Sequence, residues 1–353
     1  MLTIGVDAHK RVHVAVAVDE QGREVGAWRG PNSLAGWCDF WTWASSSGQE
    51  CRVGIEGAWG YGRGLAQHLV STGMAVFEVN ARWTAGGRRR ARQTSKTDRL
   101  DALAIAACVR QEGDALPRVS IDDETAVLNL LTVERDAATA EATRLRNQLH
   151  AHLMQLDPEY HLRLSSLRSK AGLAALQAYE VTEPDLMRQE RAAAVRRLAL
   201  RLELALSQAE EMARRIRELA AERFEPLTRL CGVSLLTAGA IAGILGPGRR
   251  FASDAALAAY AGASPLEASS AGHVRHRLNR SGNRRLNAVL YRIALTQAHY
   301  SSEARTYLAR RASEGKTKRE AMRALKRYLA RAVFRLWSEC LRPASVAEVQ
   351  LSA

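Results

Sequence analysis

The chain of 353 residues has few cysteines and no long hydrophobic run. Its five cysteines are scattered and form no Cys-x-x-Cys pair, which argues against a disulfide framework and a structural zinc site. No apolar stretch approaches the ~18 residues of a membrane span, and the start lacks the basic-then-apolar order of a signal peptide. We therefore expect a cytoplasmic protein with reduced thiols and no membrane partner.

Acidic residues are outnumbered in this chain. It has 37 Asp and Glu against 51 Lys and Arg, a formal net charge of +14. Such an excess favours a polyanionic partner, and nucleic acid is the first candidate. The hydrophobic content of 47% excludes wholesale disorder. The length suggests two or three domains.

Strand and helix patterns alternate through the first part of the chain. Alternating apolar residues predict strands; the ranges are about 2–6, 12–18, 24–29, 52–55 and 75–79. Helices are expected after Ser33, a suitable N-cap, and after the glycine-rich stretch 57–64. This order favours an α/β domain over residues 1–120, a mixed sheet covered by helices.

The remainder of the chain is predicted to be mostly helical. Leucines at three- and four-residue spacings predict two long runs at about 121–156 and 185–222. Long amphipathic helices pack on each other or on a second subunit, so we expect a coiled-coil oligomerisation segment over 121–222. A third, mostly α-helical domain is expected over 223–342, followed by a loose tail at 343–353.

Four acidic residues occupy positions typical of a metal site. Asp7 and Glu56 follow predicted strands, and Asp98 and Asp101 would share one face of a helix. Oxygen ligands suit Mg²⁺ or Mn²⁺, and two such ions could clamp the attacking and leaving oxygens of a phosphodiester. Each acid taken alone is more often a strand-end or surface residue, whereas the ordered set of four on a mixed-sheet pattern is more specific.

Three basic clusters predict an extended path for a nucleic-acid backbone rather than a membrane-binding patch. Solvated loops are the alternative interpretation. The residues that we expect to contact phosphates are Arg88, Arg89, Arg90, Arg92, Lys96, Arg275, Arg277, Arg280, Arg284, Arg285, Lys316 and Lys318.

Two segments of small residues have both a functional and a structural interpretation. The turn and helix at 232–246 could bind phosphate, as a helix-hairpin-helix does, or could simply allow close helix packing. A serine of the stretch Ser269-Ser270-Ala271-Gly272 could attack a phosphodiester beside the second basic cluster, although loop serines are usually turn formers.

Taken together, these segments resemble the DEDD transposases of the bacterial insertion-sequence 110 group over about residues 1–335. The resemblance is carried by the motifs Gly-Val-Asp-Ala-His-Lys at 5–10, Ile-Glu-Gly at 55–57, Lys-Thr-Asp-Arg-Leu-Asp-Ala at 96–102, Tyr-Ala-Gly at 260–262 and Arg-Ser-Gly-Asn-Arg-Arg-Leu at 280–286. It implies an RNase H-like domain of the RuvC type at the front and a transposase domain at the back.

The resemblance also implies a mechanism. Asp7, Glu56, Asp98 and Asp101 would bind Mg²⁺, and a serine would form a covalent phosphoserine with DNA. Members of the family often have Ser-Ser-Gly-Gly, or a single serine before glycine, at this place. In members with a single serine, that serine occupies the later position. The resemblance therefore favours Ser270 over Ser269 as the nucleophile. A bridge RNA would pair with donor and target DNA, and the long helices would join subunits into a dimer or tetramer. Such a protein would lie with the nucleoid when bound to DNA.

Two other functions remain open. A nuclease or junction resolvase of the same fold would let the four acids do all the chemistry, with water attacking and no protein–DNA adduct. A non-enzymatic nucleic-acid-binding protein would keep every activity without Mg²⁺.

Overall fold

The computed structural model describes residues 1–80, 97–164, 166–182, 185–267, 276–277, 279 and 282–341. Contacts divide the chain into two units. The first combines Met1–Ala126, Pro226–Ser234 and Ile244–Ala353, and the second combines Val127–Glu225 and Leu235–Gly243. The expected tail at 343–353 lies outside the described residues.

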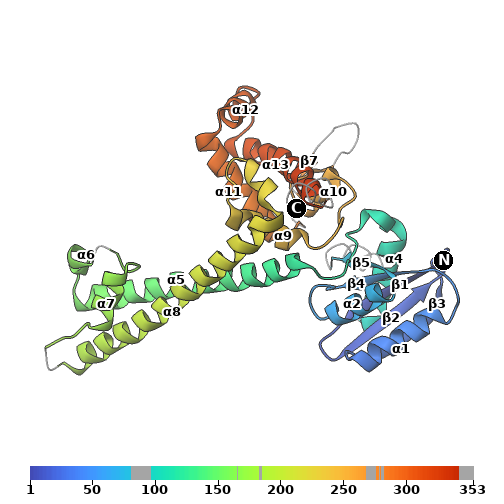
Figure 1. The fold of residues 1–353 in the computed structure, drawn as a ribbon, viewed down its shortest axis with the longest axis horizontal. Helices are drawn as coiled ribbons and strands as arrows, with labels where there is room; N and C mark the ends of the chain where they lie inside the picture. The colour runs from blue at the N-terminus through green and yellow to red at the C-terminus, as the bar shows by residue number, and fades with distance from the viewer. Residues whose placement is uncertain are drawn as a thin grey trace, which may run out of the picture. The chain divides into compact units, whose positions relative to one another are not determined.

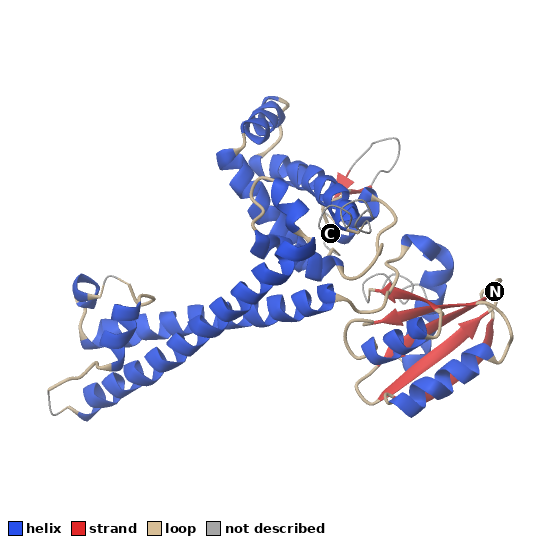
Figure 2. Ribbon diagram, viewed as in Figure 1, coloured by secondary structure: helices blue, strands red, loops and turns tan. Residues whose placement is uncertain are grey.

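A five-stranded mixed sheet forms the start of the first unit (Figure 1, Figure 2). Its order is β3 (Glu24–Pro31), β2 (Val12–Val18), β1 (Leu2–Ala8), β4 (Cys51–Glu56) and β5 (Ala75–Val79). The first three strands are antiparallel, whereas β1, β4 and β5 are mutually parallel. This order and these directions are those of the RNase H-like fold, and they confirm the predicted mixed sheet.

Helices cover both faces of the sheet. Helices α1 (Leu34–Ser45) and α2 (Arg63–Ser71) lie on one face, where Phe40, Leu65 and Leu69 pack on apolar residues of the sheet such as Ile4. On the other face α4 (Asp98–Glu112) packs across β1, β2, β4 and β5. Ser33 caps α1 as predicted, since its side chain accepts from the Gly36 amide.

The second unit is built on two long helices, α5 (Glu124–Leu156) and α8 (Leu186–Arg223), which lie side by side (Figure 1). Leucines of α5 at 145, 149 and 153 pack on Val195, Ala199 and Leu202 of α8. The short helices α6 (Tyr160–Arg163) and α7 (Lys170–Gln177) form the connector between them. The two predicted runs are therefore helices with nearly the expected bounds.

Helix α9 (Leu235–Leu245) packs on this pair through its glycines. A Cβ at Gly239 would lie 2.5 Å from Ile216 Cγ2, and one at Gly243 would lie 2.6 Å from the Asn129 amide nitrogen. The small residues of α9 thus allow close helix packing, as the structural interpretation of this segment predicts.

The C-terminal part of the first unit is mostly helical, as predicted. It contains η2 (Glu225–Arg229), α10 (Asp254–Tyr260), α11 (Arg284–Tyr300), α12 (Ser302–Ser313) and α13 (Lys318–Cys340), with the short strands β6 (Leu266–Glu267) and β7 (His276–Arg277) paired antiparallel. Ser301 caps α12, and Thr317 and Glu320 form a capping box at the start of α13. Over the described residues, no helix combines the length and apolarity needed to cross a lipid bilayer.

Candidate active site

Two of the predicted acids stand side by side on neighbouring strands. Asp7 is the next-to-last residue of β1, and Glu56 is the last residue of β4. The two strands are parallel, and Asp7 pairs in register with Glu56. Paired residues on adjacent strands lie about 5 Å apart, so both carboxylates start from the same edge of the sheet.

The other two acids reach this edge because α4 lies directly on the sheet. Gly5 and Gly54 are register partners in β1 and β4. A Cβ at Gly5 would lie 2.1 Å from the Ala102 carbonyl oxygen, and one at Gly54 would lie 2.2 Å from Val109 Cγ2. The helix can approach this closely only because both strand positions lack a side chain.

Helix α4 begins at the acidic motif. Thr97 is its N-cap, and the Thr97 side chain accepts from the Leu100 amide at 3.3 Å. Asp98 and Asp101 therefore lie in the first turn, where the helix dipole favours negative charge. Arg99 in the same turn donates to Glu24 Oε1 at 2.7 and 3.1 Å, which ties the start of the helix to β3.

A histidine that sequence reasoning did not select joins the acids. His9 Nε2 lies 3.2 Å from Asp7 Oδ2 and 3.5 Å from Asp98 Oδ1. Ligand atoms of Asp7, His9 and Asp98 all lie within 4.8 Å of one another. Within the described part of the chain, that close group does not include Glu56 or Asp101, although both lie at the same edge. The signal for His9 was its place two residues after Asp7.

The electrostatics of the cluster suit a cation. Burial raises the pKa of Asp7, and the charges of Asp101 and Asp98 raise it further, whereas His9 opposes the rise. The carboxylates thus repel one another in a partly desolvated place. A divalent ion with oxygen ligands would relieve that repulsion, so the donor set fits such an ion.

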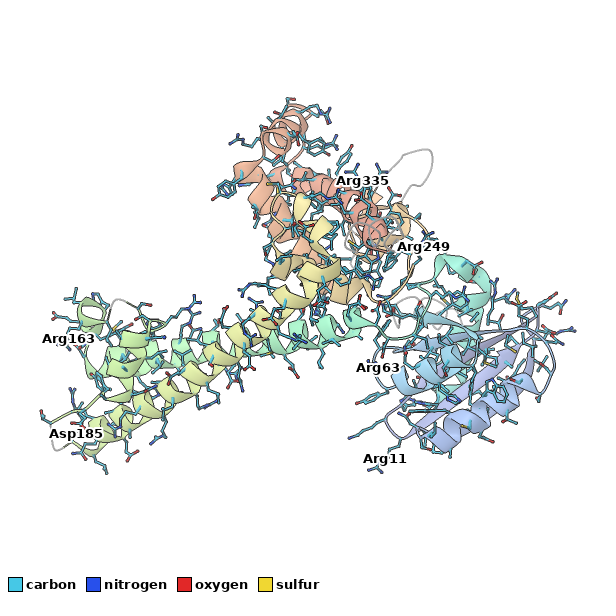
Figure 3. All side chains as sticks on the ribbon, in the orientation of Figure 1. Arg11, Arg63, Arg163, Asp185, Arg249 and Arg335 are labelled. Carbon is cyan, nitrogen blue, oxygen red and sulfur yellow. The ribbon has the colours of Figure 1, made fainter. Side chains whose placement is uncertain are left out.

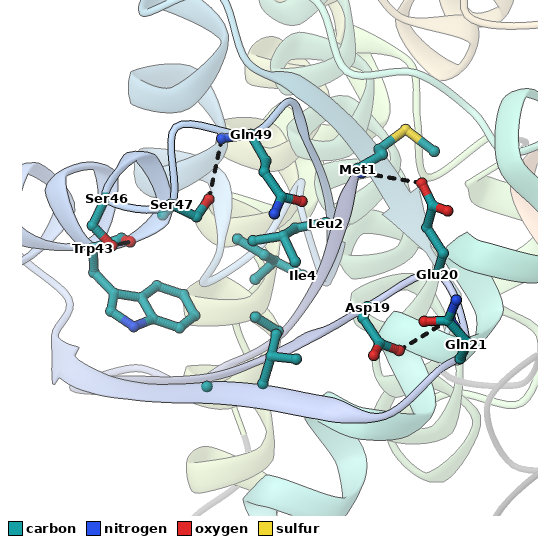
Figure 4. Close-up of a pocket in the computed structure, with 14 residues that line it drawn as sticks. Met1, Leu2, Ile4, Asp19, Glu20, Gln21, Trp43, Ser46, Ser47 and Gln49 are labelled. Carbon is teal, nitrogen blue, oxygen red and sulfur yellow. Dashed lines mark hydrogen bonds and ion pairs between the residues drawn. The ribbon is translucent and has the colours of Figure 1, made fainter.

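A cavity of about 510 Å³ lies at the opposite end of β1 (Figure 4). It is lined by Met1, Leu2, Glu20 and Trp43, among others, and the Met1 amino group pairs with Glu20 at 3.2 Å. Because Asp7 lies near the other end of the same strand, this cavity is separate from the acidic cluster.

The predicted basic and nucleophilic residues are only partly described. Arg284 and Arg285 lie in the first turn of α11, and Lys316 and Lys318 are exposed at the start of α13. Arg277 lies in β7. The others lie outside the described residues: Ser269, Ser270, Arg88, Arg89, Arg90, Arg92, Lys96, Arg275 and Arg280.

Sequence reasoning also missed a buried arginine. Arg250 is 4% exposed, and its guanidinium pairs with Glu78 at the end of β5. It also donates to the Ile244 and Leu245 carbonyls at 3.0 and 3.2 Å. Burial alone would lower the pKa of Arg250, but the Glu78 carboxylate and Tyr260 raise this pKa above its ordinary value.

Aromatic rings surround this arginine. Its guanidinium carbon lies 5.4 Å from the Trp59 ring centre, 5.3 Å from that of Phe251 and 4.9 Å from that of Tyr260. The Tyr260 hydroxyl accepts from Asn283 Nδ2 at 2.9 Å. Through Glu78 and Tyr260, Arg250 thus connects the sheet to the Tyr-Ala-Gly motif at 260–262 and to Asn283 of the motif at 280–286. The sequence had indicated no structural role for either motif.

Known proteins resemble this chain along most of its length. Residues 4–158 match the family model of the IS110 DEDD transposases, and residues 225–309 match the transposase model of the IS116/IS110/IS902 family. The Insertion element IS110 uncharacterized 43.6 kDa protein of Streptomyces coelicolor is 28% identical over 284 residues, which is 66% of this chain and 68% of that protein. A solved T. thermophilus RuvC chain in complex with a Holliday junction substrate aligns at 13% identity and a TM-score of 0.28, over 34% of this chain and 99% of that one.

The RNase H-like sheet with acids gathered at one edge fits a metal-dependent enzyme of the DEDD class. The two family models together match more than half of the residues. The chain belongs to the IS110 family of DEDD transposases. It is an enzyme whose substrate is DNA and whose chemistry depends on a divalent metal ion.

Proposed function

We propose that this transposase cuts and rejoins DNA strands through a covalent bond between Ser270 and a DNA phosphate, with Mg²⁺ held by Asp7, Glu56, Asp98 and Asp101. The observation that carries the proposal is the convergence of Asp7, Asp98 and His9 at one end of β1. The match of residues 225–309 to a transposase model supports a second catalytic part that includes Ser270.

The residues of the acidic edge have separate tasks in this proposal. Asp7 and Asp98 supply ligand oxygens, and Glu56 and Asp101 complete the set from the neighbouring strand and helix turn. A bound Mg²⁺ supplies Lewis-acid stabilisation of charge on a phosphate oxygen. His9, between Asp7 and Asp98, keeps the two carboxylates in place.

The covalent step balances without any further reactant. Ser270 Oγ attacks phosphorus, so a serine–phosphorus ester forms and the bond to one deoxyribose oxygen breaks. The serine proton ends on that leaving oxygen, which becomes a free hydroxyl. A hydroxyl of another strand reverses the step and releases Ser270. Arg275, Arg277 and Arg280 stabilise the charge that develops on the phosphate.

Sequence choice and assembly are further parts of the proposal. A guide RNA from the element reads donor and target DNA by base pairing, while the protein contacts backbones. Apolar side chains that remain exposed on α5 and α8 support assembly of at least two copies; they include Leu130, Val133, Leu200 and Leu204.

The test is a trapped reaction on nicked DNA in Mg²⁺. We expect a protein–DNA adduct that survives boiling in detergent, that disappears in Ser270→Ala and that is at most weakened in Ser269→Ala. Loss of the adduct in Ser269→Ala but not in Ser270→Ala would identify Ser269 as the nucleophile instead. Free DNA ends with no dependence on either serine would instead establish water as the nucleophile and a nuclease as the function.

A further inference from the structure

A basic site, separate from the acidic cluster, lies among the C-terminal helices. A cavity of about 520 Å³ is bounded by the turn Gly262–Pro265, by Asn279 and by the facing sides of α12 and α13. Its volume is within the range of about 300–1,000 Å³ that is usual for pockets holding a small molecule or a nucleotide. The family resemblance assigned no role to this cavity.

Positive charge dominates the wall of the cavity. Seven lining residues are lysine or arginine, and the single lining carboxylate is Glu320. Glu320 is already used at the start of α13, because it accepts from the Thr317 amide at 2.9 Å and from the Thr317 hydroxyl at 2.7 Å. Among the described residues, no carboxylate lies within ion-pair distance of Lys316, Arg323 or Arg327. The wall therefore has an excess of cations that an anion would balance.

Three further arginines of the wall are held in position by acids. Arg310 and Arg311 share Glu314, and Arg331 pairs with Asp254 at 3.2 Å. Because three guanidinium groups share two carboxylates, these pairs orient the arginines and still leave the wall positive.

Two tyrosines form the aromatic part of the wall. The rings of Tyr307 and Tyr328 meet edge to face, with centres 5.2 Å apart. Arg310 lies over the Tyr307 ring at 5.4 Å and Arg331 over the Tyr328 ring at 6.0 Å. Tyr328 is 52% exposed, so its ring remains accessible. Exposed rings among cations are typical of sites where the bases of single strands stack.

The floor of the cavity is a lysine with little solvent around it. Lys326 is 9% exposed, and its ammonium donates to Asn287 Oδ1 at 2.8 Å. Asn287 Nδ2 in turn donates to the Ala261 carbonyl at 2.7 Å, which fixes the floor to the neighbouring turn. Burial lowers the pKa of Lys326, and the charge of Arg323 lowers it further. A bound anion would offset both effects.

We propose that this cleft binds an unpaired nucleic-acid strand, with phosphates on Arg323 and Arg327 and a base against Tyr328. A paired strand keeps its bases stacked inside the duplex, so the tyrosines can contribute only to an unpaired one. The proposal rests on the proposed function only in that the strand belongs to the DNA or the guide RNA of the reaction.

The experiment measures fluorescence anisotropy of labelled oligo-dT, oligo-U and a DNA hairpin duplex with the full-length protein. For Arg323→Ala/Arg327→Ala we expect at least tenfold weaker binding of a single strand, and a salt slope lower by about 1.4 for two lost phosphate contacts. Tyr328→Leu should weaken single-strand binding about fivefold or more and leave duplex binding within twofold. Tyr328→Phe, which keeps the ring, should bind as the parent does.

Arg335→Ala is the matched control, since Arg335 is an exposed arginine of α13 that does not line the cavity (Figure 3). The proposal is overturned if Arg335→Ala and the double variant lose the same amount of single-strand affinity. It is also overturned if Tyr328→Leu weakens duplex and single-strand binding equally, or weakens neither. The oligo-dT and oligo-U arms decide whether DNA or RNA is the stronger ligand. Ser270→Ala should retain this binding, so failure of the cleft and failure of the serine mechanism give different results.

Discussion

Replacement of the buried Arg250 by alanine should destabilise the first unit strongly. The variant removes the partner of Glu78 and the donor for two backbone carbonyls, those of Ile244 and Leu245. It also removes the cation from among three aromatic rings. These groups are buried or half-buried, so water cannot easily replace the guanidinium.

The magnitude follows from the burial of the pair. Loss of one partner of a buried ion pair costs about 3–5 kcal/mol, because the other charge stays behind without compensation. Total stabilities of domains are about 5–15 kcal/mol. At about 2–4 °C for each kcal/mol in a unit of this size, the midpoint of thermal unfolding should fall by about 6–20 °C.

The assay is differential scanning calorimetry of the full chain, with Arg249→Ala as the control. Arg249 is the exposed neighbour of Arg250 and is labelled in Figure 3. We expect its replacement to change the midpoint by little. A fall in Arg250→Ala no larger than that in Arg249→Ala refutes the reasoning.

A double variant separates the charge from the packing. Arg250→Met combined with Glu78→Leu leaves no buried charge, and apolar residues of similar volume often replace such a pair at little cost. The double variant should therefore be more stable than Arg250→Ala alone. If it is less stable, the donors to the backbone carbonyls matter more than the ion pair.

Three further predictions concern the acidic edge and assembly. Asp7→Asn should abolish recombination and leave the unfolding midpoint in metal-free buffer unchanged or higher, since one of the repelling charges is gone; near-full recombination would show that Asp7 is not a ligand. Gly5→Ala should displace α4, because a Cβ would lie 2.1 Å from the Ala102 carbonyl oxygen. We expect this variant to have a lower metal affinity, measured by calorimetry, and less recombination activity. Parental values for both quantities would contradict the packing argument. Leu200→Asp/Leu204→Asp, on an exposed stripe of α8, should give a monomer by light scattering, and an unchanged oligomer would move the interface elsewhere.

The sequence predicted the sheet well because its strands are half-buried or fully buried over short runs. The alternation at Val12–Val18 and the apolar run before Glu56 both became strands with nearly the expected bounds. The positions of Asp7 near a strand end and of Asp98 at a helix start could be predicted because strand ends and helix starts are local features. Contacts between neighbours in sequence determine such features.

Features that depend on distant contacts could not be predicted. Arg250 stands in a Gly-Arg-Arg run that is typical of a solvated loop, and its burial depends on Glu78, 172 residues away. The sequence does not distinguish Gly5 and Gly54 from other strand residues, because their lack of a side chain matters only where α4 packs across both strands. Tyr307 and Tyr328 belong to different helices, so their pairing required the helices to be in place.

The division of the chain into interleaved segments has a consequence during synthesis. The first unit needs three separate pieces of sequence, Met1–Ala126, Pro226–Ser234 and Ile244–Ala353. Ribosomes add about 5–20 residues each second, so Glu78 emerges roughly 9–34 s before its partner Arg250. Over that interval Glu78 and Trp59 face solvent or a chaperone, and the sheet has to stay soluble without its C-terminal helices. A truncated chain that ends before residue 244 would remain permanently in that state.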